Sequence, residues 1–166
     1  MNNKTRIGIF AGSFDPLTNG HFDLIKRSSK IFDQVIVLIA VNTSKTALFT
    51  ALERFALIEA VIKDIANVKV DVLEDDLVAN YFKKVNGTAM IRGLRNSQDY
   101  EYESNIDIIN KKQNDELDTV LLYADNQYRY LSSSLIKEIA TFHGDISEMV
   151  PEEVEQAMKV KYNYPK

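Results

Sequence analysis

A chain of 166 residues that is 45% hydrophobic and 27% charged fits one compact globular domain, expected to span residues 1–166, and it has no apolar run long enough to cross a membrane. The absence of cysteine excludes disulfide bonds, thiolate catalysis and cysteine-bound zinc, and together with the lack of an N-terminal signal peptide it predicts a cytoplasmic protein. The net charge of −4 argues against nucleic acid as a partner, and no membrane partner is expected, so phosphate must be recognised by a few local groups.

The predicted elements alternate between apolar runs and helical patterns. In chain order they are the strand Ile7–Ala11, the helix His21–Phe32, the strand Gln34–Val41, the helix Thr50–Ile65, the strand Val68–Leu73, the helix Leu77–Val85, the strand Thr88–Gly93, the helix Ser97–Asn110, the strand Thr119–Tyr123, the helix Ser134–Phe142 and a last helix that opens at Pro151. This alternation predicts an α/β fold, namely a single-domain, Rossmann-like, doubly wound sheet of about five parallel strands with helices on both faces.

Several helix ends carry recognisable signals. Thr50 and Glu53 have the spacing of a capping box, and Thr18 or Asn19 is expected to cap the first helix. Gly144 is expected as the C-cap glycine of the helix 134–142. The helix 97–110 is expected to have one apolar face, which would carry Tyr102, Ile106 and Ile109.

The stretch GSFDPLTNGH, which follows the first strand, has the most marked chemistry in the chain. It matches neither GxGxxG nor the Walker A pattern. Gly12 would still let a ligand approach the backbone closely, and Ser13 offers a hydroxyl. Gly20 and His21 open a helix whose free N–H groups favour an anion. The residues alone leave two interpretations open, a phosphate-binding loop or an Asx/Pro turn with a solvent-exposed histidine.

Polar residues also follow three other strands, as Asn42–Lys45, Arg92–Arg95 and Tyr128–Ser134. The carboxyl ends of parallel strands share one edge of the sheet, which is where ligands bind in such folds. Each segment has a plain alternative: a loop lysine is usually solvated, arginines can pair with an acidic helix, and serines at a helix start are often only caps. Asp99 and Glu103 lie four residues apart, the spacing of a solvated acidic face as well as of a carboxylate pair.

The ten residues Gly12–His21 resemble the (H/T)xGH signature of the nucleotidylyltransferase superfamily. More narrowly, they resemble the G-[ST]-FDP-x-TNGH segment of the bacterial phosphopantetheine adenylyltransferases. The similarity continues, in the expected order, through SKTALFTALER (44–54), IRGLR (91–95), DYEYE (99–103) and LSSSLIKEIA (131–140). Five ordered blocks spread over most of the chain make the resemblance specific.

The resemblance implies that the phosphate of 4′-phosphopantetheine attacks the α-phosphorus of ATP in line, giving dephospho-coenzyme A and pyrophosphate. No His/Asp cluster in the sequence indicates a metal site on the protein, so Mg²⁺ is expected to be delivered with the ATP. His21 would stabilise the transition state, and Lys45 and Arg92 would complete the catalytic set. The implied ATP-binding residues are Ser13, Phe14, His21, Gly93, Leu94, Arg95, Glu103, Tyr128, Arg129, Tyr130, Leu131, Ser132, Ser133 and Ser134. The implied phosphopantetheine-binding residues are Ser13, Lys45, Val78 and Arg92.

The resemblance also implies a homohexamer and feedback inhibition by coenzyme A. It assigns no role to Asn42 or Asp99, and it leaves the roles of Asp15 and Lys137 undecided. Two other activities in the superfamily are alternatives, cytidylyl transfer and the adenylylation of a pyridine mononucleotide, and IRGLR and TNGH argue against both. A nucleotide-binding regulator without catalysis is a further alternative, which the presence of His21, Lys45 and Arg92 disfavours.

Overall fold

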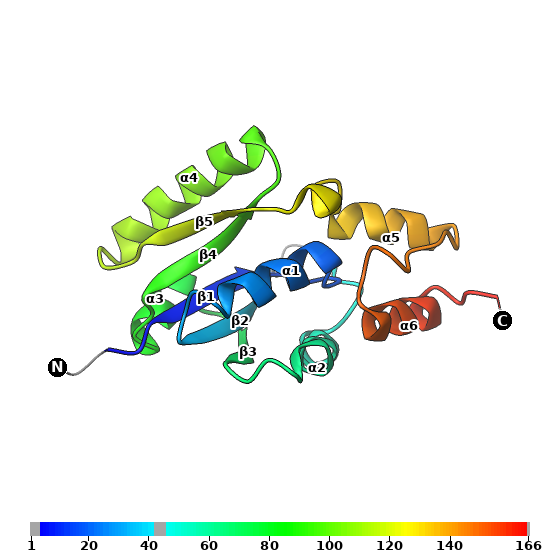
Figure 1. The fold of residues 1–166 in the computed structure, drawn as a ribbon, viewed down its shortest axis with the longest axis horizontal. Coiled ribbons are helices and arrows are strands. Elements are labelled where there is room, and N and C mark those ends of the chain that lie inside the picture. Colours follow the sequence, from blue (N-terminus) through cyan, green and yellow to red (C-terminus); the bar gives the residue numbers. More distant parts are fainter. Residues whose placement is uncertain (1–3, 42–45, 166) are drawn as a thin grey trace.

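The computed structural model describes residues 4–41 and 46–165 of the chain (Figure 1). Its strands are β1 (Ile7–Gly12), β2 (Gln34–Ala40), β3 (Val68–Leu73), β4 (Ala89–Leu94) and β5 (Thr119–Tyr123). Its helices are α1 (Asn19–Ser28), α2 (Ala51–Ile62), α3 (Val78–Lys84), α4 (Ser97–Gln113), α5 (Ser133–Thr141) and α6 (Glu152–Lys161), with a 3-10 turn η1 (Asn126–Tyr128) before α5. Within these described residues, no helix has the length and apolar character needed to cross a membrane.

The five strands form one sheet in the order β3-β2-β1-β4-β5, and every neighbouring pair is parallel. This order confirms the predicted doubly wound α/β fold. β1 pairs with β2 over the whole length of β1, from Ile7↔Gln34 to Gly12↔Ile39. β1 and β4 pair only near their amino ends, at Gly8↔Ala89 and Ile9↔Met90. The two central strands therefore separate toward their carboxyl ends, where the chain changes direction across the sheet, and a crevice can form there.

β2 shows how the sheet is buried on both faces, because its residues 35–39 are fully buried and alternate between two clusters. Val35, Val37 and Ile39 pack into the larger cluster, to which α1, α2, α5 and α6 contribute side chains. Ile36 and Leu38 pack into the smaller cluster with side chains of α3. This alternation is the period-two geometry of a strand covered by helices on both sides.

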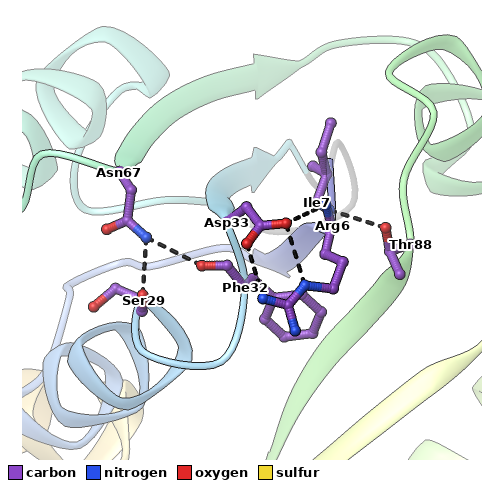
Figure 2. A network of polar contacts seen from close by, with 7 residues as sticks. All are labelled: Arg6, Ile7, Ser29, Phe32, Asp33, Asn67 and Thr88. Carbon is purple, nitrogen blue, oxygen red and sulfur yellow. Dashed lines mark hydrogen bonds and ion pairs between the residues drawn. The ribbon is translucent and has the colours of Figure 1, made fainter. Parts of the chain in front are cut away.

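Polar contacts close the amino ends of the strands (Figure 2). Arg6 and Asp33 form a bidentate ion pair, with 2.8 Å from Nη2 to Oδ1 and 3.2 Å from Nε to Oδ2. The side-chain amide of Asn67 donates to the carbonyl oxygens of Ser29 at 2.8 Å and Phe32 at 3.1 Å. The bonds from Asn67 satisfy two carbonyl groups that follow the end of α1. This helix ends at Ser28, four residues before the predicted end at Phe32. The polar residues predicted to bind ligands lie at the opposite end of the sheet, at the carboxyl ends of β1 and β4.

Two expectations about helix ends are confirmed and one is wrong. Thr50 and Glu53 form the predicted capping box, and Thr18 caps α1. Gly144 does not take the left-handed conformation expected of a C-cap glycine; His143 takes it instead, with φ 55°. Gly144 is needed for space, because a Cβ placed there would lie 2.6 Å from Cγ2 of Ile139.

The apolar face expected on α4 does not enter the core, since no residue of this helix is buried. Tyr102 is 62% exposed and Ile109 is 55% exposed. Ile106 is only partly exposed and lines a cavity at the carboxyl end of the sheet. The helical spacing of apolar residues in α4 therefore identified a face whose side chains Tyr102 and Ile109 are exposed to solvent in the single chain.

Candidate active site

Two neighbouring cavities, of about 310 and 300 Å³, lie at the carboxyl ends of β1 and β4. They share a wall made of the end of β1 and two side chains from β4 and α4, namely Ala11, Gly12, Ser13, Arg92 and Glu103. The separation of β1 from β4 opens the sheet at this wall. The site can therefore hold two ligands side by side, with their nearest ends meeting at the shared residues.

Ten of the residues expected to bind ATP line the first cavity: Ser13, Phe14, His21, Gly93, Arg95, Glu103, Tyr128, Leu131, Ser132 and Ser133. Arg92, expected to bind phosphopantetheine, lines it as well. These residues come from the loop after β1, from α1, from β4 and the residue after it, from α4, from η1 and from the start of α5. Val78 and Arg92, expected to contact phosphopantetheine, line the second cavity with Ser13. The predicted Lys45 and its neighbour Asn42 lie outside the described residues.

His21 occupies the third position of α1 and forms a capping box with Thr18. The backbone N–H of Thr18 donates to Nδ1 of His21 at 3.1 Å, and the N–H of His21 donates to Oγ1 of Thr18 at 3.2 Å. Since a backbone N–H can only donate, Nδ1 must be the acceptor, and the proton of the neutral ring is on Nε2. The cap therefore fixes both the tautomer and the position of the imidazole.

The imidazole of His21 packs edge-to-face on the ring of Phe14, with 5.3 Å between the ring centroids. Phe14 is itself almost fully buried and has φ 47°, a left-handed conformation that turns the chain directly after β1. Burial, and to a lesser extent the nearby positive charge of Arg95, together lower the pKa of His21 to about 4. At neutral pH the ring is therefore an uncharged donor aimed from a helix N-terminus, where backbone N–H groups also favour an anion.

Two hydrogen bonds hold the guanidinium of Arg92 between the two cavities. Its Nε donates to Oε2 of Glu103 at 2.6 Å, and its Nη1 donates to the carbonyl oxygen of Ala11 at 2.5 Å. These two bonds use Nε and Nη1. Among the described residues, Nη2 of Arg92 has no hydrogen-bond partner, so it can donate to a ligand. Glu103, which the resemblance assigns to ATP, thus holds Arg92 in place, since a charged pair at this distance strongly orients the guanidinium fork.

Arg95 is held in the same way by Asp99, whose role the sequence did not reveal. Both Nε and Nη2 of Arg95 donate to the Asp99 carboxylate, at 3.0 and 3.1 Å, and the backbone N–H of Arg95 donates to it at 2.8 Å. Nη1 of Arg95 donates to the carbonyl oxygen of Leu131, just before α5. Asp99 follows Arg95 by four residues, and this i, i+4 spacing was the sequence signal for the ion pair. The same spacing is also common between residues on a solvated helix face.

The start of α5 supplies the serines of the first cavity. Ser132 caps the helix by accepting from the N–H of Leu135 at 3.1 Å, and Ser133 donates to the carbonyl oxygen of Pro16 at 2.8 Å. These contacts anchor the helix N-terminus against the loop after β1. Four of the predicted ATP residues do not line the cavity: Leu94, Arg129, Tyr130 and Ser134. Arg129 donates its Nε to the carbonyl oxygen of Arg95 at 2.8 Å, and Tyr130 is 57% exposed.

The second cavity has residues that sequence reasoning missed. Its apolar lining includes Ala40, Met90 and Ile106 as well as the predicted Val78, and its polar lining includes Asp107, Asn110 and Thr119. The hydroxyl of Thr119 donates to Asp107 at 2.7 Å. These side chains come from β2, β4, α4 and β5, and no short motif joins them, so only the folded chain brings them together.

Comparisons with known proteins identify the family to which the chain belongs. Residues 9–139 match the model of the cytidylyltransferase-like family, so the chain is a nucleotidyltransferase. A phosphopantetheine adenylyltransferase from Levilactobacillus brevis is 52% identical over 92% of this chain and 94% of its own length. Another, from Lachnoclostridium phytofermentans, is 49% identical over 95% and 96% of the two chains. The chain belongs to the cytidylyltransferase-like family and, within it, to the phosphopantetheine adenylyltransferases. The predicted family and enzyme class are confirmed.

Solved structures support the fold at lower identity. Plasmodium falciparum nicotinic acid mononucleotide adenylyltransferase, complexed with NaAD, has a TM-score of 0.70 and 16% identity, covering 98% of this chain and 99% of that one. A Vibrio parahaemolyticus protein described as a candidate nicotinate-nucleotide adenylyltransferase has a TM-score of 0.74 and 19% identity, covering 98% of both chains. At these identities the likeness concerns the fold.

The pKa of His21 gives a direct test of the site's electrostatics. In an NMR titration of the ligand-free protein, the His21 ring should remain the neutral Nε2–H tautomer until the pH approaches about 4, well below the ordinary value of 6.5. Between these two pH values the unfolded chain binds a proton that the folded chain does not, so His21 should reduce stability as the pH falls through that window. Arg95→Gln should raise the pKa, because it removes a neighbouring cation. A wild-type His21 that titrates near pH 6.5 would contradict the assignment.

Proposed function

We propose that this chain transfers the adenylyl group of ATP to 4′-phosphopantetheine, giving dephospho-coenzyme A and pyrophosphate in coenzyme A biosynthesis, within one nucleotidylyltransferase domain spanning residues 1–166. The observation that carries the proposal is the pair of cavities with Arg92 and Ser13 in their common wall. Relatives that are 44–52% identical over most of the chain carry the name of this activity.

ATP occupies the first cavity, with its phosphates against the N-termini of α1 and α5. His21, Arg95 and the serines of α5 surround that space, and these groups offer N–H and O–H donors to phosphate oxygens. The nucleoside lies toward Tyr128, whose ring can contact a base. Both phosphate-binding helix ends are therefore directed at the same part of the nucleotide.

4′-Phosphopantetheine occupies the second cavity, with its phosphate at Arg92 and Ser13. The apolar side chains Val78, Met90 and Ile106 suit the hydrocarbon parts of the arm, and Asn110 can bond to its amides. Lys45 is proposed as a second cation for the substrate phosphate. This arrangement places the attacking phosphate and the α-phosphate of ATP on either side of the shared wall.

The reaction then follows from positioning and charge. A phosphate oxygen of phosphopantetheine forms a bond to the α-phosphorus of ATP while the bond from that phosphorus to the bridging oxygen of pyrophosphate breaks. Negative charge grows on the non-bridging α-phosphate oxygens, and Nε2–H of His21 donates to them. Holding both substrates in line removes most of the entropic cost of their encounter.

Nucleotidyltransferases that act on ATP generally use a divalent metal ion. Among residues 4–41 and 46–165, no cluster of three or more His, Cys, Asp or Glu side chains could hold one. Asp99 and Glu103, the carboxylates of the first cavity, are paired with arginines. We therefore propose that Mg²⁺ arrives on the ATP phosphates and keeps mostly water ligands, where it would neutralise phosphate charge. We also propose a cytoplasmic location and inhibition by coenzyme A, which contains the same pantetheine arm as the substrate.

Pyrophosphate release tests the proposed activity. With ATP, the protein should turn over 4′-phosphopantetheine and neither nicotinamide mononucleotide nor glycerol 3-phosphate. His21→Ala should lower kcat by about 10²–10³ while leaving ATP binding largely intact, because its donor acts on charge that develops in the transition state. Absence of turnover with phosphopantetheine would reject the function, and a collapse of ATP affinity would make His21 a binding residue.

Arg92 and Lys45 should separate the two substrates. Either Arg92→Ala or Lys45→Ala should raise the KM for phosphopantetheine by about tenfold or more, because each removes a charged donor to its phosphate, and should change the KM for ATP much less. Arg27→Ala is a matched control, since Arg27 pairs with Asp23 on α1 outside both cavities. A larger increase in the KM for ATP than in the KM for phosphopantetheine would mean that the two substrates occupy the opposite cavities from those proposed.

We further propose a homohexamer, with the apolar face of α4 in an interface. Tyr102 and Ile109 lie two turns apart on one side of the helix and are mostly exposed, an unusual place for large apolar side chains. In analytical ultracentrifugation the wild type should sediment as six chains of 18.9 kDa. Ile109→Glu should produce smaller species, while the control Val160→Glu, at an exposed valine on α6, should not. A wild-type monomer would reject the proposal.

A further inference from the structure

Asp15 is buried in the middle of the loop after β1, and its carboxylate has partners on two other segments of the chain. Oδ2 accepts from the backbone N–H of Leu48 at 2.8 Å, and Oδ1 accepts from the N–H of Phe49 at 2.9 Å. Nζ of Lys137, on α5, lies 3.2 Å from Oδ2. One side chain therefore joins the loop after β1, the segment before α2 and the helix α5.

Two further contacts reinforce this junction. Arg54, buried in α2, donates its Nη1 to the carbonyl oxygen of Ser13 at 2.7 Å and its Nε to that of Thr50 at 3.3 Å. Ser133 donates to Pro16 from the start of α5. The loop is thus bound on one side to the start of α2 and on the other to the helix end that faces the first cavity.

We propose that Asp15 and Lys137 are positioning residues, which set the distance between the ATP-binding and phosphopantetheine-binding halves of the site; this inference rests on the proposed function. Lys137 belongs to α5, whose first residues Ser132 and Ser133 line the first cavity. Leu48 and Phe49 follow Lys45 closely in the sequence and fix the point from which the chain enters α2. Ser13, which both cavities share, lies two residues before Asp15.

The charge of Asp15 matters as well as its shape. The carboxylate presents acceptors to three donors, two backbone N–H groups and one ammonium. An amide of the same shape would accept through one oxygen only and would turn its NH₂ group toward another donor. Buried donors without acceptors are costly, so the segment at Leu48 and Phe49 would move away. A shift of about 1 Å at this junction can cost in-line transfer about a hundredfold.

The test compares Asp15→Asn and Lys137→Met with the wild type in pyrophosphate release. Both should lower kcat and raise the KM for phosphopantetheine, by about tenfold to a hundredfold in kcat/KM for Asp15→Asn and less for Lys137→Met, with the KM for ATP within about twofold. Lys137→Arg should restore activity, because it keeps the cation. In the double variant the two losses should not add, since Lys137 acts through Asp15.

Lys159→Met is the matched control, because it removes a lysine–carboxylate pair with Glu155 on α6, 2.7 Å long and outside both cavities. It should leave the kinetics unchanged. Hydrogen exchange supplies a readout that does not need turnover: the amides of Leu48 and Phe49 should exchange faster in Asp15→Asn and in Lys137→Met. If Asp15→Asn does not fold, Lys137→Met and its rescue by Lys137→Arg carry the test.

The outcomes separate this inference from the proposed function. A wild type that does not turn over phosphopantetheine rejects the function. A wild type that does, with variants that match it in kinetics, overturns the positioning role alone. Unchanged exchange at Leu48 and Phe49 would also overturn it, as would equal losses for both substrates, which indicate a general loss of structure.

Discussion

The partial pairing of β1 with β4 is the constraint on which the rest of the site depends. Parallel pairing brings the carboxyl ends of all strands to one edge, and in this sheet the two central strands are bonded only near their amino ends. The groups that would have continued the ladder, from Ala11 to Ser13 and at Arg92, instead form the wall between two cavities. Two adjoining cavities therefore form where the ladder between β1 and β4 stops, and α4 completes their shared wall with Glu103.

In this chain, whose net charge is −4, three cations at or near the two cavities each have a fixed carboxylate partner. Arg92 is held by Glu103, Arg95 by Asp99, and Lys137 by Asp15. These pairs orient donors that would otherwise sample many rotamers, so the ordering cost is met on folding and not during binding. Burial and the positive charge of Arg95 together lower the pKa of His21 and keep its ring neutral.

The sequence predicted those parts of the molecule that depend on local pattern. The parallel sheet with helices on both faces followed from the alternation of elements, the capping box at Thr50 from two residues, and the family from five ordered blocks. What it could not supply depends on distance in the fold. The sequence alone suggested that Asp99 is a solvated acid, and its pairing with Arg95 became visible only in the fold. Asp107 and Asn110 belong to no motif, although they line the second cavity. At the C-terminus of α5 the residue in the left-handed conformation is His143 and not Gly144.

The loop GSFDPLTNGH can now be divided by function along its length. Gly12 and Ser13 line both cavities, Phe14 turns the chain and packs against the imidazole, and Asp15 ties the loop to α5 and to the start of α2. Thr18 caps the helix with the same bonds that fix the tautomer of His21. The neutral imidazole of His21 can stabilise a transition state only if the start of α1 keeps a fixed position. The buried carboxylate of Asp15, six residues earlier, fixes the loop that leads to this helix start.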